Sequence, residues 1–229
     1  MTPGRPRVIA NFAITADGKV STRNYTPTGF TSPADKARLR AIRALGDAVM
    51  VGAGTLSHDA MSLRLSSQAL QRERTARGMA AEPLRVIVSN RGRIDPGGKA
   101  FQTTGAPRVI FSTRRMPVKI QSALAGRADL WLLGHPLPLP AVLAILRREY
   151  AVKTLICEGG PTLFRSLLEI GAIDELRLTW APVVFGGAKA PTLTGLPGKF
   201  LPRTVRARLV EMETVGSECF LAYKFSPVR

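Results

Sequence analysis

The stretch LICEGGPTLFRSLLE, residues 155–169, constrains the fold more than any other part of this sequence. The apolar run from Thr154 to Cys157 has the length of a buried strand, and the helical pattern that follows begins at Pro161 and stops at Gly171. Proline at the first helical position and glycine just past the last turn are the residues that helix ends favour. The stretch therefore predicts a strand, a Gly159-Gly160 turn and a helix.

The Gly159-Gly160 turn has two interpretations. Two residues without Cβ let a ligand approach the backbone, and the N–H groups of the helix start, with the positive end of the helix dipole behind them, favour a phosphate. A plain strand-to-helix turn would use the same two glycines without any ligand. The glycines alone leave both interpretations open.

Buried strands alternate with helices along the chain up to about Gly171. Strands are predicted at residues 8–14, 47–51, 85–89, 108–112, 129–133 and 154–157, with helices from Pro33 to Gly46, within the polar segment 66–80, and at about 141–150. The segment 66–80 is expected to be a solvated surface helix, and residues 91–107 to be loop and turn. Alternating strands at 175–180, 205–212 and 219–225 follow, the last two as an antiparallel hairpin. We expect one α/β domain over residues 1–229 with a mixed sheet.

Four loops at the ends of predicted strands could bind a ligand: TADGK at 15–19, GAGTLSHD at 52–59, VSNRGR at 88–93 and EGGPT at 158–162. Loops after the carboxyl ends of parallel strands lie on one edge of a sheet, so these four could share a cleft. The GAGT turn lacks the third glycine of a dinucleotide fingerprint and predicts only a generic phosphate or ligand turn. Asn11, inside the first strand, is an amide that needs partners, either a ligand or backbone.

The net charge of +17 is the most unusual bulk property. Basic residues are spread along the chain with no run longer than a pair, and only 6% of the residues are aromatic. A diffuse basic field favours attraction of small polyanions over nucleic acid, which remains the less favoured alternative.

Several classes of protein find no support in the sequence. No apolar window approaches the roughly 18 residues of a spanning helix, and the first residues lack the features of a signal peptide, so we expect a cytoplasmic protein without a membrane partner. Cys157 and Cys219 are expected to be reduced thiols. There is no GxxxxGK[ST] loop, no GxSxG elbow and no zinc-deaminase signature, and two histidines predict no metal site.

Several motifs in one order resemble the reductase domain of riboflavin biosynthesis, in its free-standing form. They are ADGK at 16–19, TSPADK at 31–36 continuing to DAVMVGAGT at 47–55, LRVIVSN at 84–90, CEGGPTLF at 157–164, IDEL at 173–176 and APVVFGG at 181–187. The resemblance implies a dihydrofolate-reductase-like three-layer fold with helices on both faces of a mostly parallel sheet. It also implies a homodimer and an NADPH-dependent reduction of the ribosyl group of an aminopyrimidine phosphate to ribityl, by hydride transfer to C1′.

The resemblance also implies a role for individual residues. The cofactor would be held by residues of several strand-end loops and of the EGGPT turn: Ile14, Gly29, Gly52, Gly54, Thr55, Asp59, Asn90, Gly159, Gly160, Pro161, Thr162, Leu163 and Phe164. The substrate would be contacted by Arg43 and Glu158, with Ser62 and Arg64 near its phosphate, and Asn11 and Lys19 complete the substrate set. The candidate proton donors are Glu158 and Asp17, although water could also serve.

One segment departs from the family pattern. A DDPxLTxR-like run commonly follows the GxGT turn, whereas this chain has HDAMSLRL at 58–65, in which the proline is lost and the arginine is shifted in register. The departure concerns the substrate phosphate, so reduction of another small molecule, such as a dihydrofolate-like pteridine, is the alternative function. The sequence does not say whether the pyrimidine is aminated or deaminated.

Overall fold

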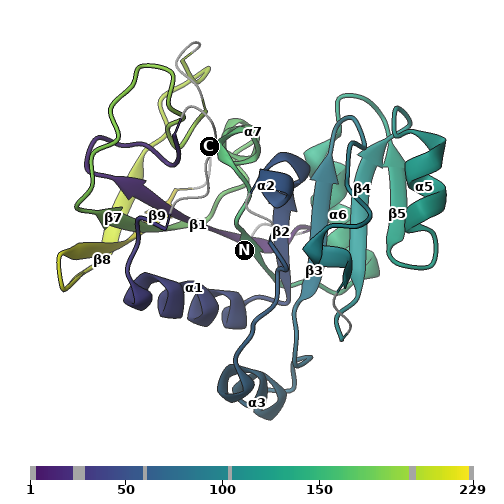
Figure 1. Ribbon diagram of the computed structural model, residues 1–229, viewed down its shortest axis with the longest axis horizontal. Coiled ribbons are helices and arrows are strands. Elements are labelled where there is room, and N and C mark those ends of the chain that lie inside the picture. The colour runs from purple at the N-terminus through teal and green to yellow at the C-terminus, as the bar shows by residue number, and fades with distance from the viewer. Residues whose placement is uncertain (1–3, 23–28, 59–60, 103–104, 196–199, 227–229) are drawn as a thin grey trace. The chain divides into compact units, whose positions relative to one another are not determined.

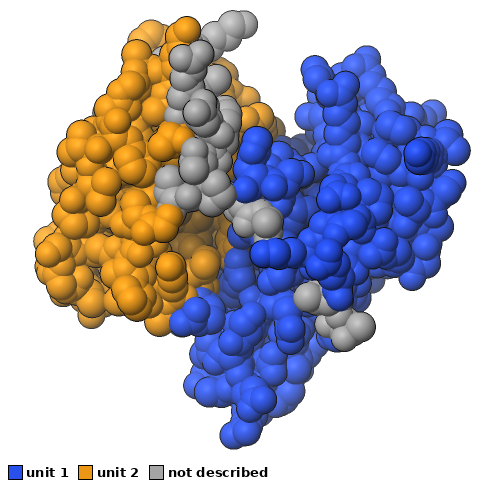
Figure 2. Space-filling model, in the orientation of Figure 1, with its two compact units in different colours: residues 1–6, 40–156 blue, residues 7–39, 157–229 orange. Residues whose placement is uncertain are grey.

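The computed structural model describes residues 4–22, 29–58, 61–102, 105–195 and 200–226. The chain divides into two compact units, coloured separately in Figure 2: unit 1 contains residues 1–6 and 40–156, and unit 2 contains residues 7–39 and 157–229. Helix α1 (Pro33–Leu45) and strand β6 (Thr154–Cys157) each run from one unit into the other. Each unit is built around its own set of strands.

The strands of unit 1 lie in the order β5-β4-β3-β2-β6 (Figure 1). The pairs β2/β3, β3/β4 and β4/β5 are parallel. Apolar runs fill the interior, since Val49, Met50, Ile87 and Ile110 are fully buried, as expected for strands covered on both faces. The elements of unit 1 beyond α1 and β6 are β2 (Ala48–Gly52), α2 (Ala53–His58), α3 (Gln68–Ala76), β3 (Leu84–Ser89), α4 (Lys99–Gln102), β4 (Arg108–Thr113), α5 (Val118–Leu124), β5 (Asp129–Leu133) and α6 (Leu139–Glu149).

The prediction of α3 as a solvated surface helix is wrong for Arg74. This side chain is only 1% exposed, and its guanidinium donates hydrogen bonds to the carbonyl oxygens of Ala80, Ala44 and Gly46. The last two are carbonyls at the end of α1, which the helix itself leaves without partners. Arg74 thus fastens α3 to the end of α1, a contact that no local pattern reveals.

Three short helices were absent from the sequence prediction. Helix α2 lies inside the segment 52–59 and α4 inside the segment 91–107, both expected to be loop, and α5 follows β4. Helix α5 has no side-chain N-cap that would have marked its start, because Pro117 is at that position. All three are too short to carry a clear helical period.

The strands of unit 2 lie in the order β1-β7-β9-β8, and its remaining elements are β1 (Arg7–Thr15), α7 (Pro161–Glu169), β7 (Glu175–Ala181), β8 (Ala207–Val215) and β9 (Glu218–Phe225). Strands β1 and β7 are parallel, whereas β7/β9 and β8/β9 are antiparallel. The predicted hairpin at the C-terminal end is confirmed, and so is the α/β class with a mostly parallel sheet. That all of residues 1–229 form one domain remains a prediction.

Helices α1 and α7 lie on opposite faces of the unit 2 strands (Figure 1). Phe12 of β1 contacts Phe164 of α7, with ring centroids 5.0 Å apart. Thr179 of β7 pairs with Ala13, the residue after Phe12, in the β1/β7 register. Its hydroxyl donates a hydrogen bond to Asp35 and accepts one from Arg38, both of which lie on α1. Because successive residues of a strand point to opposite faces, the two helices cover different faces.

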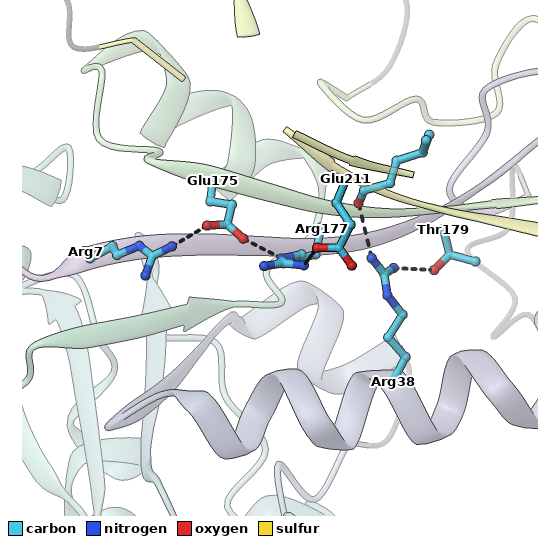
Figure 3. A network of polar contacts seen from close by, with 7 residues as sticks. Arg7, Arg38, Glu175, Arg177, Thr179 and Glu211 are labelled. Atoms are coloured by element: carbon cyan, nitrogen blue, oxygen red, sulfur yellow. Dashed lines mark hydrogen bonds and ion pairs between the residues drawn. The ribbon is translucent and has the colours of Figure 1, made fainter. Parts of the chain in front are cut away.

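The α1 face of unit 2 carries a polar network (Figure 3). The buried carboxylate of Glu175 accepts hydrogen bonds from both Arg7 and Arg177, and Arg177 also pairs with Glu211 of β8. Arg38 of α1 donates to Thr179 and to the Leu221 carbonyl, and its guanidinium lies 4.6 Å from the centroid of the Phe220 ring. These contacts tie β1, β7, β8, β9 and α1 together.

Candidate cofactor- and substrate-binding site

The EGGPT turn connects β6 to α7 in the predicted way. Gly160 is the N-cap in an extended conformation, no side chain caps the helix, and Pro161 is at its start. The Gly160 carbonyl accepts the amides of Leu163 and Phe164. Because Pro161 has no N–H and the Leu163 and Phe164 amides already donate to Gly160, Thr162 is the residue in the first turn of α7 whose amide can meet an anion, as the ligand interpretation requires.

Gly159 is required by close packing. A Cβ at this position would lie 2.4 Å from Cδ2 and 3.0 Å from Cβ of Leu163, which is itself buried. This contact sets the direction in which the chain enters α7. The sequence suggested close ligand approach, whereas the structure shows a packing reason that holds with or without a ligand.

We expect Gly159→Ala to lower the free energy of unfolding by about 1–3 kcal/mol, the usual cost of overpacking a buried site. It should also weaken dinucleotide binding, because the turn must move to relieve the contact with Leu163. Urea unfolding measures the first effect. Gly134→Ala is the matched control, since a Cβ there meets nothing within 4 Å, and an equal loss in both variants would contradict the argument.

The unit 2 residues predicted for the cofactor and substrate divide between the two faces of β1. Ile14 is level with Trp180 and points to the same face as Phe12, the face covered by α7. Asn11 is level with Arg177 and points to the α1 face, together with the polar network. Gly29 is exposed. The structure thus brings Ile14 to the face of the EGGPT helix and sets Asn11 apart from it.

The TADGK turn and the loop that follows β7 are joined by Asp17. Its carboxylate accepts hydrogen bonds from the Thr15 hydroxyl at 2.5 Å, the Gly186 amide at 2.8 Å and the Phe185 amide at 3.2 Å. Donation from Thr15, and next from the two backbone amides, lowers the pKa of Asp17 below its usual 3.8. A carboxylate held in this way is suited to positioning the loop and poorly suited to donating a proton.

Asp17→Asn tests this role through pH. Because the folded-state pKa is lowered, the stabilisation by Asp17 is present above the unfolded-state value and is lost as the pH falls through the folded value. The melting temperature of the variant should therefore lie below that of the wild type at neutral pH, and the two should converge below pH 3.8. A constant difference across that range would contradict the assignment.

A hollow beside this loop was missed by the sequence analysis. It has a volume of about 310 Å³ and is lined by Thr22, Phe185, Gly186, Gly187, Ala188, Lys189 and Ala190. Gly186 and Gly187 have φ of 65° and 76°, which explains the glycine pair of the APVVFGG motif. Lys19 forms an isolated antiparallel β-bridge with Thr192, which follows the lining residues in the sequence. The sequence signal that could have indicated this hollow is the Gly186-Gly187 pair, which is followed two residues later by Lys189.

In unit 1, the predicted cofactor residues lie at the ends of β2 and β3. Gly52 ends β2, and Gly54 and Thr55 lie in helix α2, so the prediction of residues 52–59 as a loop is wrong for most of the segment. Asn90 follows β3, and its side-chain oxygen accepts the Leu137 amide at 2.7 Å. Asp59, also predicted for the cofactor, lies outside the described residues.

The predicted substrate residues of unit 1 are close together. Arg43 is buried, and its guanidinium donates to the Arg64 carbonyl at 2.7 Å. The Ser62 hydroxyl accepts the Arg64 amide at 3.4 Å, and the Arg64 side chain is exposed. The charged end of Arg43 is thus turned toward the loop that carries Arg64.

Glu158 is only 8% exposed, directly after β6 and before the two glycines. Cys157 beside it is a free thiol, and burial raises its pKa to about 12, so it stays protonated. Within the described ranges, no His, Cys, Asp and Glu side chains gather in a group of three that could hold a metal ion. Among the same residues, no helix has the length and hydropathy needed to cross a membrane.

The arrangement of strands and helices is that of the reductase region of RibD structures. Acinetobacter baumannii RibD superimposes with a TM-score of 0.81 at 22% identity, over 99% of this chain and 60% of that one. The chain thus spans about three fifths of that protein. A pyrimidine reductase-like protein of Corynebacterium diphtheriae gives the same TM-score over 96% of this chain and 92% of that one. The fold class is that of the pyrimidine reductases.

The family is shown by the sequence. The family model described as RibD C-terminal domain matches residues 6–221, and the chain belongs to this family. A relative from Archaeoglobus fulgidus, named 2,5-diamino-6-ribosylamino-4(3H)-pyrimidinone 5′-phosphate reductase, is 30% identical over 223 residues, which cover 97% of this chain and 99% of the relative. A relative of the same name from Methanothermobacter thermautotrophicus is 30% identical over 221 residues, 96% of this chain and 98% of its own. The resemblance inferred from the motifs is confirmed.

Proposed function

We propose that this protein reduces the ribosyl group of an aminopyrimidine ribosylamino 5′-phosphate to ribityl, as a step of riboflavin biosynthesis. The observation that supports this most strongly is family membership over almost the whole chain, together with relatives of nearly equal length that bear this reductase name. Their name also favours the aminated pyrimidine over the deaminated one as the substrate.

The proposed cofactor is NADPH, which when bound would supply the hydride that adds to C1′ of the opened ribosyl group. Four exposed arginines favour the 2′-phosphorylated dinucleotide over NADH: Arg91, Arg93, Arg114 and Arg115. They lie on the loops after β3 and β4, which are tied together because the Ser112 and Thr113 hydroxyls donate to the carbonyls of Ser89 and Asn90. Arginines at the carboxyl ends of parallel strands suit a phosphate.

The roles of the protein's own residues follow from this proposal. The Thr162 amide and the positive end of the α7 dipole would hold a phosphate of the dinucleotide, and Ile14 would contact its nicotinamide end. Glu158 would orient the substrate and deliver the proton that balances the hydride, and Lys19 would stabilise developing negative charge. The protein would act chiefly by alignment of the two reacting carbons, at roughly 3–3.5 Å.

Nicotinamide absorbance provides the test. NADPH oxidation should be measured with the aminated and the deaminated ribosylaminopyrimidine phosphates, with dihydrofolate as the control substrate and NADH as the control cofactor. We expect turnover with the aminated compound and a preference for NADPH. Turnover of dihydrofolate, or none with either pyrimidine while NADPH binds tightly, would overturn the proposed substrate.

A homodimer is also proposed. Strand β8 is the edge strand of the unit 2 sheet, and Leu209, Val210 and Met212 on it are exposed. An apolar edge strand of this kind favours a covering partner, and a second copy of the chain can supply one. Light scattering gives the mass in solution.

A further inference from the structure

The segment from Ser62 to Ser66, which overlaps the end of the HDAMSLRL departure at 58–65, forms a strained hook. Leu63 and Ser66 have φ of 56° and 52°, in the left-handed region that a branched, bulky residue such as leucine rarely adopts. Leu63 and Leu65 are both fully buried, whereas Arg64 between them is exposed. A conformation of this kind persists only when its surroundings determine it, so something must hold the hook.

Two buried side chains hold it, and both are 8% exposed. Arg43, from the end of α1, donates to the Arg64 carbonyl at 2.7 Å. Glu82, from the loop between α3 and β3, accepts the Leu65 amide on one carboxylate oxygen at 2.9 Å and the Gln71 side-chain amide on the other at 2.8 Å. Both side chains thus hold the same peptide group, the one between Arg64 and Leu65, by its carbonyl oxygen and its N–H.

We infer that Glu82 is a positioning residue, which with Arg43 holds this hook so that the Arg64 guanidinium faces outward to receive the 5′-phosphate of the substrate. The inference rests on the proposed function for the identity of the anion. Because the backbone of Arg64 is held between two buried leucines, its planar guanidinium starts from a defined position, which favours bidentate recognition of a phosphate. The shifted arginine register therefore has a structural cause, because positions 63 and 65 are buried and position 64 is exposed.

A carboxylate suits position 82 because it can accept both hydrogen bonds. Glutamine keeps the size of the side chain but offers one carbonyl oxygen and one NH₂ group. In Glu82→Gln, the Leu65 amide therefore keeps only a neutral acceptor, and Gln71 must reverse its side-chain amide to accept a hydrogen bond from the new NH₂ group. The substitution loosens the hook without removing Arg64 or leaving a cavity.

The test compares Glu82→Gln and Arg64→Gln with the wild type on the phosphorylated substrate and on its dephosphorylated form. We expect KM for the phosphorylated substrate to rise about tenfold in Glu82→Gln and further in Arg64→Gln, the size expected for loss of a charge-assisted hydrogen bond. The kcat and the KM for NADPH should stay near the wild-type values. For the dephosphorylated substrate, kcat/KM should be equal in all three proteins.

Glu73→Gln is the matched control, an exposed glutamate of α3, and should leave all constants unchanged. Equal losses on both substrates, or a fall in kcat at constant KM, would overturn the inference and leave Glu82 a purely structural residue. If Glu82→Gln does not fold, Arg64→Gln and Arg64→Lys carry the test, because Arg64 is exposed.

Binding of ribose 5-phosphate, measured by calorimetry, separates this inference from the proposed function. A wild-type protein that turns over neither pyrimidine contradicts the proposed function alone. Even if the protein turns over neither pyrimidine, the hook is supported as a phosphate site when the wild type binds ribose 5-phosphate and both Glu82→Gln and Arg64→Gln bind it more weakly. Binding that neither variant weakens, or no binding, overturns it.

Discussion

Replacing Glu158 with Gln should lower kcat by about a hundredfold or more, within the usual range for loss of a general acid. The residue follows β6 directly and is 8% exposed, so it lies at the strand end in a site largely closed to water. Glutamine has nearly the same shape and can still hydrogen-bond, but it cannot give up a proton in the reaction. Of the two candidate carboxyl groups, Asp17 is held as an acceptor by three donors and is poorly suited to give up a proton, so the prediction is made for Glu158.

Steady-state kinetics at saturating NADPH separate two roles for Glu158. A fall in kcat at nearly constant KM indicates proton delivery, whereas a rise in KM alone indicates substrate binding. Glu169→Gln, at the exposed end of α7, is the control and should behave as the wild type. Unchanged kinetics in Glu158→Gln would remove the residue from the site.

Replacing Glu175 with Ala should reduce the free energy of unfolding by about 2–3 kcal/mol, somewhat less than the usual cost of breaking a buried ion pair. Glu175 is 1% exposed and its carboxylate joins Arg7 of β1 to Arg177 of β7 (Figure 3). Without it, two arginines remain next to each other on one face of the sheet. The side chains of Arg7 and Arg177 are 41% and 24% exposed, so water can solvate both. The loss of unfolding free energy should therefore be smaller than that for a fully buried ion pair.

Glu211→Gln is the matched control for this prediction. Glu211 pairs with the same Arg177, but its side chain is 52% exposed. Exposed ion pairs typically contribute less than about 1 kcal/mol, so this variant should unfold close to the wild type. Guanidinium chloride would screen charge, so urea is the suitable denaturant. Similar losses in the two variants would show that burial of Glu175 does not matter.

The sequence predicted the elements well where a local pattern is strong. Strand β6 and helix α7 begin where the apolar run and Pro161 place them, and α1 begins at Pro33 after Ser32 as its capping pattern indicates. Helices too short to show a clear helical period, such as α2, α4 and α5, were missed. The motifs also gave the family, because several of them occur in one order.

The roles of individual polar side chains were less predictable. Arg74, Arg43 and Glu82 are charged residues, a type that is mostly exposed in proteins, yet all three are buried. Their partners are largely backbone groups far along the chain, such as the Ala44 carbonyl for Arg74 and the Leu65 amide for Glu82. A sequence pattern reports periodicity and composition, and it contains no information on which distant carbonyl or amide a side chain will meet.

The sequence by itself thus determined the α/β class, the family and the strand-end loops that carry its motifs, because these depend on local periodicity and on residue order. Only the tertiary structure decided which carboxyl groups are held as acceptors, why Gly159 cannot carry a Cβ, and how a hook with a shifted arginine is kept in place. These properties depend on packing and hydrogen bonds between residues distant in the chain, which exist only once the chain is folded.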